Sequence, residues 1–414
     1  MGEFAYDEPT SLSRVLALAD DLSGAAETAA ALLPAFGTGE LRLSGTRPEH
    51  RYAHTAQAVV SNLVVVDLDS RHGPAEPTAA AVDHALRDRG ARSAHTFIKI
   101  DSLLRGNVAA TLSAAGPVVF APALPTAGRT VRGGVLHLRG VALHETAAWR
   151  AEPAAPPTGI AELLAPGPCR HVPLDAVRSP DLPAALRASL AAAEIPLCDG
   201  ETDSDLDAVV AATLALGSAT AGVRLAGSGA LAAALGRALP PHASATAPAP
   251  NSAHGLLFVV GTAERTAREQ VRRLVAAGAR QVPLDASALL GGEADAGRIT
   301  GALRRAPVVL TVDAPDGVDP AQSRALVQGL ADTARRAVAA ADRPVDLVLT
   351  GGETARRVLD ALGVPALAPL AQIHHGAVHS RAPGGTSVVT RPGSFGEADS
   401  LVRIAEHLRP PTEG

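Results

Sequence analysis

The sequence predicts an α/β fold with two domains, each a mostly parallel sheet flanked by helices. Short apolar runs rich in Val, Ile and Leu alternate with Ala- and Leu-rich helical stretches along the chain. A segment rich in Pro, Ala and Ser, without apolar periodicity, covers 240–254. The length of 414 residues is enough for two or three domains. We therefore expect a first domain at 1–239, a linker at 240–254 and a second domain at 255–414.

The individual elements follow from the same alternation. The expected strands are short apolar runs bounded by polar or Gly residues, at 14–19, 58–67, 96–100, 117–121, 222–225, 256–260, 307–312 and 345–350. The expected helices have apolar residues at helical spacing, at 24–33, 75–89, 265–277, 320–341 and 354–362, with a further helix that follows the turn 227–229 and ends at 239. The Pro-rich stretch 151–168 predicts a surface excursion of the first domain.

Composition excludes several classes of protein. Aromatic residues make up 2% of the chain and the net charge is −5, so no basic, aromatic surface for nucleic acid is expected. Cys169 and Cys198 show no metal-binding or CxxC spacing, which indicates reduced, buried thiols. No signal sequence or membrane-spanning run is evident, so we expect a cytoplasmic protein without a membrane partner.

A pair of acids follows the first predicted strand. Asp20 and Asp21 precede Leu22-Ser23-Gly24, where a helix is expected to begin. The carboxyl end of a parallel strand is where open α/β sheets bind ligands. A carboxylate there can accept a proton from a substrate hydroxyl or bind Mg²⁺. The alternative is that one Asp only caps the helix, assisted by Ser23.

The segment 97–107 contains five polar side chains of different kinds within eleven residues. Lys99 and Asp101 are two residues apart, so they share one face of the predicted strand. Ser102, Arg105 and Asn107 follow in the turn into the next helix. These residue types suit a cradle for a carboxylate and several hydroxyl groups, although a salt-bridged turn would use the same residues. Lys99 is also the single lysine of a chain that otherwise uses Arg, which indicates a role for a compact ammonium group.

Two further turns supply cations. Asp69-Ser70-Arg71 follows the strand that ends at Asp67, and Arg71 can there contact an anionic substrate or lie in a solvated turn. The segment 121–134 begins as a buried strand and continues as a long loop, with Arg129 and Thr130 expected at its tip.

The second domain contains three Gly-containing turns, each expected after a strand. They are Gly261-Thr262, Gly351-Gly352-Glu353-Thr354 and the segment 392–396 with Gly393 and Gly396. A strand, paired glycines and a helix N-terminus form an arrangement that binds phosphate through free N–H groups. A tight turn without a ligand would have the same sequence, but three such turns in one domain predict a nucleotide pocket. His374, His375 and His379 have no spacing typical of a metal site, so we expect them in loops and assign no metal ligands.

The order of these motifs resembles the four-carbon acid sugar kinase family, formerly a domain of unknown function. The family's DD-x-TG, D-S-R, K-x-D-S-x-x-RGN, AP-x-x-P-x-x-GRT, GGET and PG-x-FG motifs correspond to segments that begin at Asp20, Asp69, Lys99, Ala121, Gly351 and Pro392. The resemblance implies an N-terminal domain that binds a sugar acid, a C-terminal domain that binds ATP, and an active site in the cleft between them. It implies transfer of phosphate to the terminal hydroxyl of erythronate, threonate or a 3-oxo-tetronate.

Combined with the residues themselves, the resemblance gives a provisional site. Phosphoryl transfer depends on positioning and charge neutralisation, with Mg²⁺ bridging the ATP phosphates. The catalytic candidates are Asp21, Asp101 and Lys99. The substrate-binding candidates are Asp20, Ser23, Arg71, Ser102, Arg105, Asn107, Arg129 and Thr130. The nucleotide candidates are Gly261, Thr262, Gly351, Gly352, Glu353, Thr354, Gly393 and Gly396.

The chain departs from the family pattern at four positions. Ser23 replaces Thr, Leu103 replaces a frequent Thr, Gly133 replaces Asn and Arg391 replaces a common Lys. The changes at Leu103 and Gly133 lie near the presumed acceptor, so they leave the acceptor's identity open. Two alternatives therefore stand beside the sugar-acid kinase: the same chemistry on another small polar acceptor, and a non-catalytic cytosolic sensor of small molecules. Assembly as a homo-oligomer is also left open.

Overall fold

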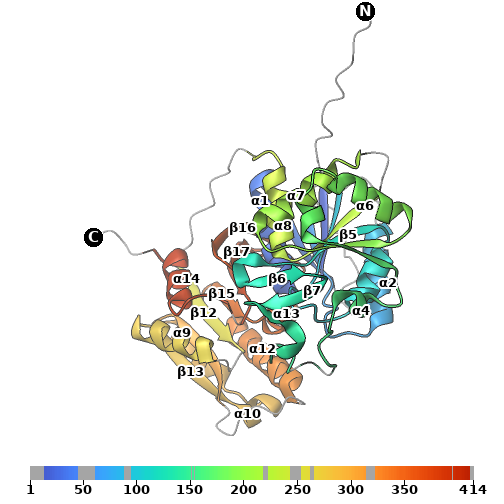
Figure 1. Ribbon diagram of the computed structural model, residues 1–414. Coiled ribbons are helices and arrows are strands. Elements are labelled where there is room, and N and C mark those ends of the chain that lie inside the picture. Colours follow the sequence, from blue (N-terminus) through green and yellow to red (C-terminus); the bar gives the residue numbers. More distant parts are fainter. Residues whose placement is uncertain are drawn as a thin grey trace, which may run out of the picture.

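The computed structural model shows an α/β protein built around one extended sheet (Figure 1). It describes residues 14–44, 61–87, 95–150, 152, 154–217, 222–242, 253–261, 265–313, 322–393 and 395–410. Predicted residue Thr262 and most of the predicted linker, residues 243–252, lie outside these ranges. The boundary at 240–254 therefore stays a prediction. Within the described residues, none of the helices has the length and apolar character needed to cross a bilayer.

The N-terminal half forms a sheet of parallel strands. In spatial order they are β2 (Glu40–Leu43), β3 (Leu63–Asp67), β1 (Val15–Ala19), β4 (His95–Lys99), β11 (Arg224–Gly227), β5 (Val118–Ala121), β10 (Ile195–Cys198) and β9 (Cys169–Val172). Because all of these strands run in one direction, their carboxyl ends meet at one edge of the sheet.

Helices cover both faces of these strands. The first group contains α1 (Leu22–Phe36), α6 (Leu182–Ala191), α7 (Asp203–Leu214) and α8 (Gly229–Ala238), and the second contains α2 (Ala75–Arg87), α3 (Val108–Ala115) and α4 (Ile160–Leu164). The right-handed crossovers of parallel strands place the two groups on opposite faces. The short helix α5 (Leu174–Val177) packs against α6 and α7.

A small antiparallel sheet projects from the N-terminal half. Its strands are β6 (Arg129–Arg132), β7 (Val135–Leu138) and β8 (Val141–Ala142), flanked by the 3-10 turns η2 (Pro125–Ala127) and η3 (Leu143–Glu145). The expectation that Arg129 and Thr130 lie at a loop tip was therefore wrong. Gly133 and Gly134 have φ of +60° and +70°, so the tip lies there, where glycine accepts the left-handed backbone that reverses the chain.

The C-terminal half has five parallel strands and an antiparallel extension. In spatial order the strands are β13 (Arg280–Asp285), β14 (Val308–Asp313), β12 (Gly255–Val260), β15 (Val345–Thr350), β18 (Ser387–Arg391), β17 (Ala377–Arg381) and β16 (Ala366–His374). The helices are α9 (Arg265–Ala276), α10 (Ala286–Leu290), α11 (Ala296–Leu303), α12 (Ser323–Ala339), α13 (Gly352–Ala361) and α14 (Ser400–Leu408). His374 and His379 lie in β16 and β17, so their assignment to loops was wrong.

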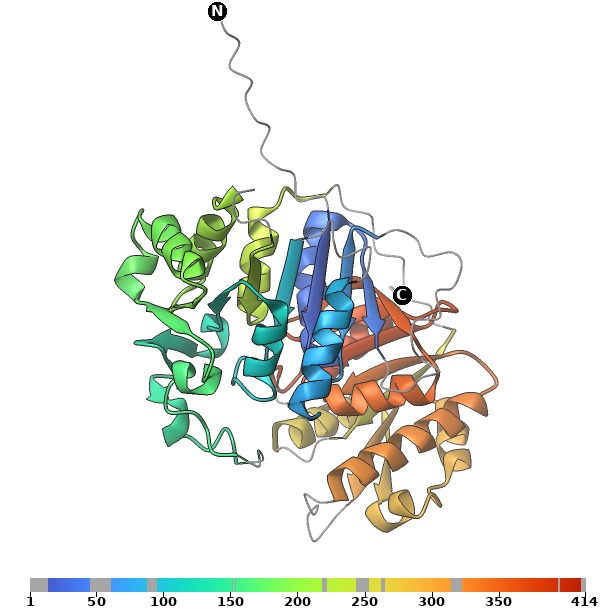
Figure 2. The same cartoon turned by 90° about the vertical axis from the view of Figure 1, so that its right-hand side faces the viewer.

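The two halves share one sheet of 15 strands among the described residues. Strand β16 pairs antiparallel with β2, through Ala366 with Arg42 and Leu367 with Leu41. In Figure 2 the red strands of the C-terminal half stand directly beside the blue strands of the N-terminal half. The pairing satisfies backbone groups that an isolated edge strand would expose.

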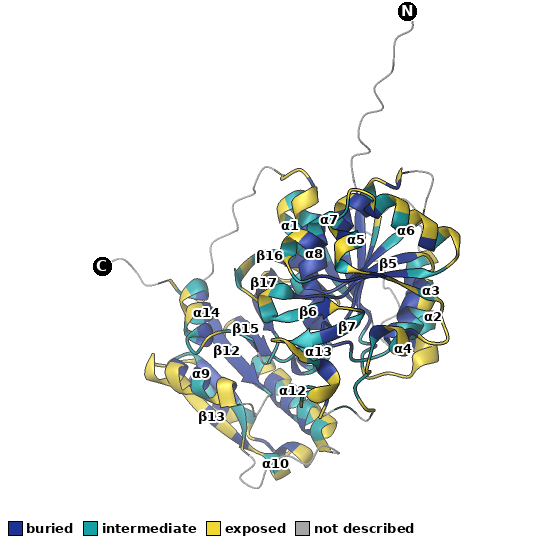
Figure 3. Cartoon of the chain, viewed as in Figure 1, coloured by how far each residue is buried: buried dark blue, intermediate teal, exposed yellow. Residues whose placement is uncertain are grey.

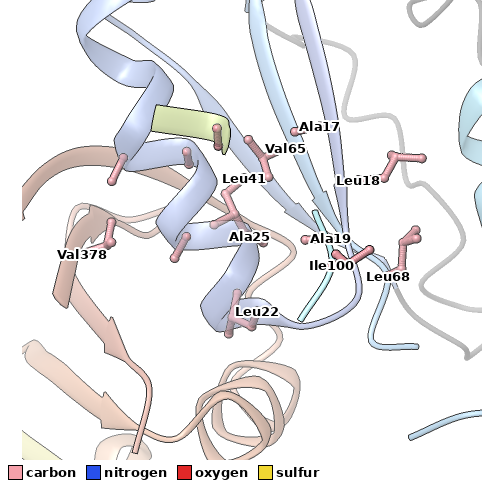
Figure 4. Close-up of a cluster of buried hydrophobic side chains, with 14 of the residues drawn as sticks. Ala17, Leu18, Ala19, Leu22, Ala25, Leu41, Val65, Leu68, Ile100 and Val378 are labelled. Atoms are coloured by element: carbon pink, nitrogen blue, oxygen red, sulfur yellow. The ribbon is translucent and has the colours of Figure 1, made fainter. Parts of the chain in front are cut away.

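Buried residues extend across this junction. Figure 3 shows helices packed over the buried strands of both halves. Helix α1 packs against β1 and β3 and also against β16, β17 and β18. Figure 4 shows Leu22 and Ala25 of α1 in one cluster with Leu41 of β2 and Val378 of β17. Ala side chains along α1 allow close approach from both sides, so the helix that follows the acidic pair is fixed by both halves.

Candidate active site

The carboxyl ends of β3, β1 and β4 bring together the predicted acidic and basic residues of the N-terminal half. The strand register sets Ala19 opposite both Asp67 and Lys99. Asp20 and Asp21, the Asp69–Arg71 turn and the Lys99–Arg105 segment therefore leave the sheet side by side. The role of these residues as a binding or catalytic site stays a prediction.

Arg71 connects the acidic pair. Its Nε and Nη2 atoms donate to the two carboxylate oxygens of Asp20 at 2.8 and 2.9 Å, and its Nη1 donates to Asp21 Oδ2 at 2.8 Å. Burial raises the pKa of Asp20, and the Arg71 guanidinium only partly offsets this. Burial works against the charge of Arg71, but the surrounding carboxylates of Asp20, Asp21 and Asp101 raise its pKa well above the usual value. Arg71 is thus a fixed partner of the acids, not a cation free for substrate.

Asp101 organises the turn that follows β4. It accepts hydrogen bonds from the backbone N–H groups of Leu103 and Arg105 and from the Arg105 side chain, whose Nε lies 2.6 Å from Oδ2. Burial alone would raise the pKa of Asp101, but Arg71 and Arg105 together hold it well below its usual range. A carboxylate that accepts so many hydrogen bonds is a weak proton acceptor.

Two other predicted substrate residues have structural partners. The Nδ2 atom of Asn107 donates to the backbone oxygens of Ser70 and Gly73, at 3.2 and 2.8 Å, and to Thr78 Oγ1. Asn107 therefore fixes the turn that carries Arg71. Thr130 lies on β6, opposite His137, next to Arg129.

Lys99 is buried at the end of β4, with 4% of its side chain exposed. Its Nζ atom donates to the backbone oxygen of Ile100 at 3.0 Å and lies 3.5 Å from Glu27 Oε2. Glu27 on α1 was not found from the sequence. Its position four residues after Ser23, on the same face of the helix, is the signal that could have indicated it.

Two glycines make room for this pair. A Cβ atom on Gly24 would lie 3.0 Å from Lys99 Nζ, and one on Gly229 would lie 2.2 Å from the Glu27 carboxyl carbon. Gly229 is the first residue of α8, whose N-cap Ser228 accepts a hydrogen bond from Ala230 N. The N-termini of α1 and α8 therefore both lie beside the buried ion pair, and their partial positive charge favours anions at this place.

The predicted nucleotide turns lie at the ends of neighbouring strands. Gly261 follows β12, Gly351 follows β15 and Gly393 follows β18 after Pro392, and these three strands are adjacent and parallel. Gly351 has φ of +96°, a conformation that side chains rarely permit. A Cβ atom on Gly261 would lie 2.1 Å from Thr354 Oγ1, so a side chain there would displace the first turn of α13. The sheet thus brings the three turns together, as predicted.

The turn that contains Phe395 and Gly396 is held by buried polar residues. Gln270 Nε2 donates to the backbone oxygens of Gly396 and Glu397 at 3.0 and 2.9 Å. Arg391, at 1% exposure, donates to the backbone oxygen of Phe395 and to Gln270 Oε1. The backbone oxygen of Arg391 in turn accepts a hydrogen bond from the N–H of Gly351 at 2.8 Å. The phosphate-type turn and the Phe395 turn are therefore directly linked.

The motifs of the two halves meet at Gly352, the first residue of α13. A Cβ atom on Gly352 would lie 2.7 Å from Asp21 Oδ2 and 3.0 Å from Ser23 Oγ. Asp21 caps α1, accepting a hydrogen bond from Gly24 N at 2.8 Å. The buried Ser23 Oγ has no hydrogen-bond partner among the described residues. The N-termini of α1 and α13 thus face each other across the acidic pair.

Two arginines of α13 fix this arrangement. Arg356 Nη1 lies 2.8 Å from Asp67 Oδ2, with side-chain exposures of 3% and 0%, and Arg357 pairs with Asp69. Asp69 has φ of +49°, a backbone conformation that non-glycine residues rarely adopt and that is often found at functional sites. Neither arginine was predicted. Their acidic partners were visible as strand-end residues, but nothing in the sequence connects them to α13.

Comparisons with known proteins match two segments of the chain to described families. Residues 15–235 match the family described as a sugar-binding N-terminal domain, and residues 257–401 match the one described as a nucleotide-binding C-terminal domain. The fold and site therefore define a protein with one sugar-binding and one nucleotide-binding domain.

Curated relatives are named as kinases. D-threonate kinase of Cupriavidus necator is 31% identical over 420 residues, which cover 93% of this chain and 96% of its own length. D-threonate kinase of Bordetella bronchiseptica is 31% identical over 413 residues, which cover 95% and 96%. The chain belongs to the four-carbon acid sugar kinase family.

Solved structures show the same fold. A Salmonella typhimurium protein titled a putative tRNA synthase matches with a TM-score of 0.74 at 21% identity, covering 94% of this chain and 98% of its own. A Haemophilus influenzae protein of the family once called a domain of unknown function matches with a TM-score of 0.72 at 19% identity, covering 95% of this chain and 100% of its own.

Proposed function

We propose that this protein transfers the γ-phosphate of ATP to the terminal hydroxyl of a four-carbon sugar acid, in an active site between its two halves. D-threonate is the first acceptor to test, because the curated relatives are named for it. A cytoplasmic location and a homo-oligomeric state stay predictions from the sequence.

The contact between Gly352 and the Asp21–Ser23 segment carries the proposal. A phosphoryl group can be transferred only when donor and acceptor are held within about 3–3.5 Å in line. The turn suited to ATP phosphates and the acid suited to an attacking hydroxyl belong to different halves of the chain, yet a Cβ atom added to Gly352 would lie only 2.7 Å from Asp21 Oδ2. The same arrangement favours catalysis over binding alone, because a sensor has no need of an acid beside the phosphate turn.

The turns at Gly261, Gly351 and Gly393 would line the phosphates through backbone N–H groups and the N-terminus of α13. The described residues contain no group of three or more His, Cys, Asp or Glu suited to a metal. This fits Mg²⁺ that is bound mainly by phosphates, with at most one or two carboxylates. Glu353 in the first turn of α13 is a carboxylate available to it. Bound there, Mg²⁺ would neutralise charge on the phosphates.

Asp21 is the better candidate for the proton acceptor. Its Oδ2 accepts one hydrogen bond, from Arg71, and faces Gly352. The Asp101 carboxylate accepts four, and although burial alone would raise its pKa, Arg71 and Arg105 hold that pKa low. A proton acceptor must lie within reach of the attacking hydroxyl, beside the phosphoryl group that takes the proton's place on the substrate oxygen. We therefore assign proton removal to Asp21 and the organisation of the β4 turn to Asp101.

The test is release of ADP from ATP in the presence of a panel of tetronates, with and without each acid. We expect acid-dependent ADP release and a phosphorylated tetronate, with D-threonate among the substrates. Asp21→Asn should lower kcat by about 100-fold or more while tetronate still binds. ATP hydrolysis independent of any acid, or binding of tetronate without turnover, would refute the kinase proposal and favour another acceptor or a sensor.

A further inference from the structure

The cations of the candidate site differ in their partners. Arg71, Lys99 and Arg105 each lie within ion-pair distance of a carboxylate, at 2.8, 3.5 and 2.6 Å. Among the residues that the structure describes, no carboxylate lies within ion-pair distance of Arg129. Its Nη1 atom donates to the hydroxyl of Ser102, the residue that follows Asp101.

The surroundings of Arg129 suit an anionic ligand. The side chain is partly buried, and this burial lowers its pKa below the usual value of an arginine, although a guanidinium stays charged in proteins. A guanidinium has five N–H donors in a planar fork that matches the two oxygens of a carboxylate. A desolvated charge of this kind is costly unless a partner is supplied. Among the described residues no carboxylate forms an ion pair with Arg129, and the acid substrate carries a carboxylate.

The nucleotide half also reaches Arg129. Its Cζ atom lies 5.9 Å from the centroid of the Phe395 ring, within the range of a cation–π interaction. Phe395 belongs to the turn that Arg391 and Gln270 hold, and that turn is joined to Gly351 by the backbone hydrogen bond described above. An aromatic side chain of one half therefore lies over the cation of the other.

We propose that Arg129 binds the carboxylate of the sugar acid, and that Phe395 is a positioning residue that holds the guanidinium in place from the nucleotide half. The proposal rests on the proposed function and deepens it, because it names the group that distinguishes a sugar acid from a neutral sugar alcohol. It also means that the acid site is complete only when the Phe395 turn is in place.

The test compares each tetronate with the matching tetritol, which has a hydroxymethyl group in place of the carboxylate. For the wild type we expect a strong preference for the acid in kcat/KM. Arg129→Gln should lower kcat/KM for the acid by about 10- to 100-fold, as expected for a lost charge-assisted contact, and leave the value for the tetritol within about threefold. The KM for ATP should be unchanged.

Phe395 is tested by conservative and non-conservative replacement. Phe395→Leu should raise the KM for the acid by about 3- to 10-fold, the size of a partly desolvated cation–π contact, whereas Phe395→Tyr should behave as the wild type. Arg132→Gln is the matched control: Arg132 lies on the same strand, is exposed and pairs with Glu201 outside the site. It should change neither substrate preference nor KM.

Several outcomes would overturn the assignment. One is an equal fall in kcat/KM for the acid and for the tetritol in Arg129→Gln. Another is an unchanged KM for the acid in a folded Phe395→Leu variant. If Arg129→Gln failed to fold, the Phe395 pair would decide the question. If the wild type turned over no sugar acid and bound none by calorimetry, the proposed function itself would fail, and this assignment with it. If the wild type phosphorylated a sugar acid, and Arg129→Gln and Phe395→Leu both kept its preference for the acid over the tetritol, this assignment alone would be overturned.

Discussion

Replacing Arg356 with methionine would test the ion pair that joins α13 to the N-terminal half. Arg356 Nη1 lies 2.8 Å from Asp67 Oδ2, and both side chains are nearly inaccessible to solvent. The Arg356 side chain also donates to Ser44 O and to Asp360 Oδ1. Arg356→Met removes three hydrogen bonds and leaves the Asp67 carboxyl buried without its cation. We expect a loss of unfolding free energy that depends on pH.

The magnitude follows from the titration of Asp67. Burial raises its pKa to about 7, and Arg356 only partly offsets this. The folded protein therefore binds more protons here than the unfolded chain, so this group's contribution to the unfolding free energy falls as pH rises from about 4 to about 7. Without Arg356 the pKa rises further. Near pH 6 the Asp67 carboxyl is protonated in both proteins. There the loss of hydrogen bonds lowers the unfolding free energy of the variant by roughly 2–3 kcal/mol relative to the wild type. Above pH 7 this difference grows by about 1.4 kcal/mol for each pH unit, to a total of about 3–5 kcal/mol near pH 8.

The assay is urea unfolding at pH 6, 7 and 8 for the wild type, Arg356→Met, Asp67→Asn and the double variant. The double variant should recover part of the loss and show no additional slope with pH, because it has no buried charge to titrate. A loss in Arg356→Met that is the same at all three pH values would refute the reasoning. So would a double variant that is less stable than Arg356→Met.

Three further predictions concern single residues. Gly352→Ala should lower kcat at least about tenfold, because its Cβ would lie 2.7 Å from Asp21 Oδ2; Gly301→Ala, whose Cβ would meet nothing within 4 Å, is the control and should leave kcat unchanged. Lys99→Arg should cost about 1–3 kcal/mol by melting analysis, because the site is buried, and lower kcat/KM at least about tenfold; wild-type turnover would contradict this. Burial lowers the pKa of His379 to about 4, so the unfolded chain binds more protons below pH 6.5. The unfolding free energy should fall by up to about 3 kcal/mol from pH 6.5 to 4, and His379→Gln should flatten this slope in acid unfolding; an unchanged slope would argue against a buried neutral imidazole.

The sequence alone indicated eight of the fifteen strands of the described sheet and the polar residues at several of their ends; β2, β9, β10, β13, β16, β17 and β18 were not among the strands predicted. Buried parallel strands are continuous apolar runs, and polar residues that follow them must lie at one edge of the sheet, since all the strands point the same way. Asp20, Asp21, Lys99 and Asp101 could therefore be placed together from local pattern. The Gly351 turn could be placed in the same way, because paired glycines between a strand and a helix indicate a tight turn at the carboxyl end of that strand.

Partners far apart along the chain were decided only by the tertiary structure. Arg356 meets Asp67 across 289 positions, and Arg129 meets Phe395 from a hairpin that had been expected as a loop. The joining of both sheets through β16 and β2 rests on two residue pairs with no distinctive sequence. Local propensity and periodicity depend on neighbours within a few positions, whereas these contacts depend on how α1 and α13 pack. For this reason the sequence identified many polar residues of the site but not Glu27 or Arg356, and only the fold showed that Arg71, Lys99 and Arg105 are paired with carboxylates while Arg129, among the described residues, is not.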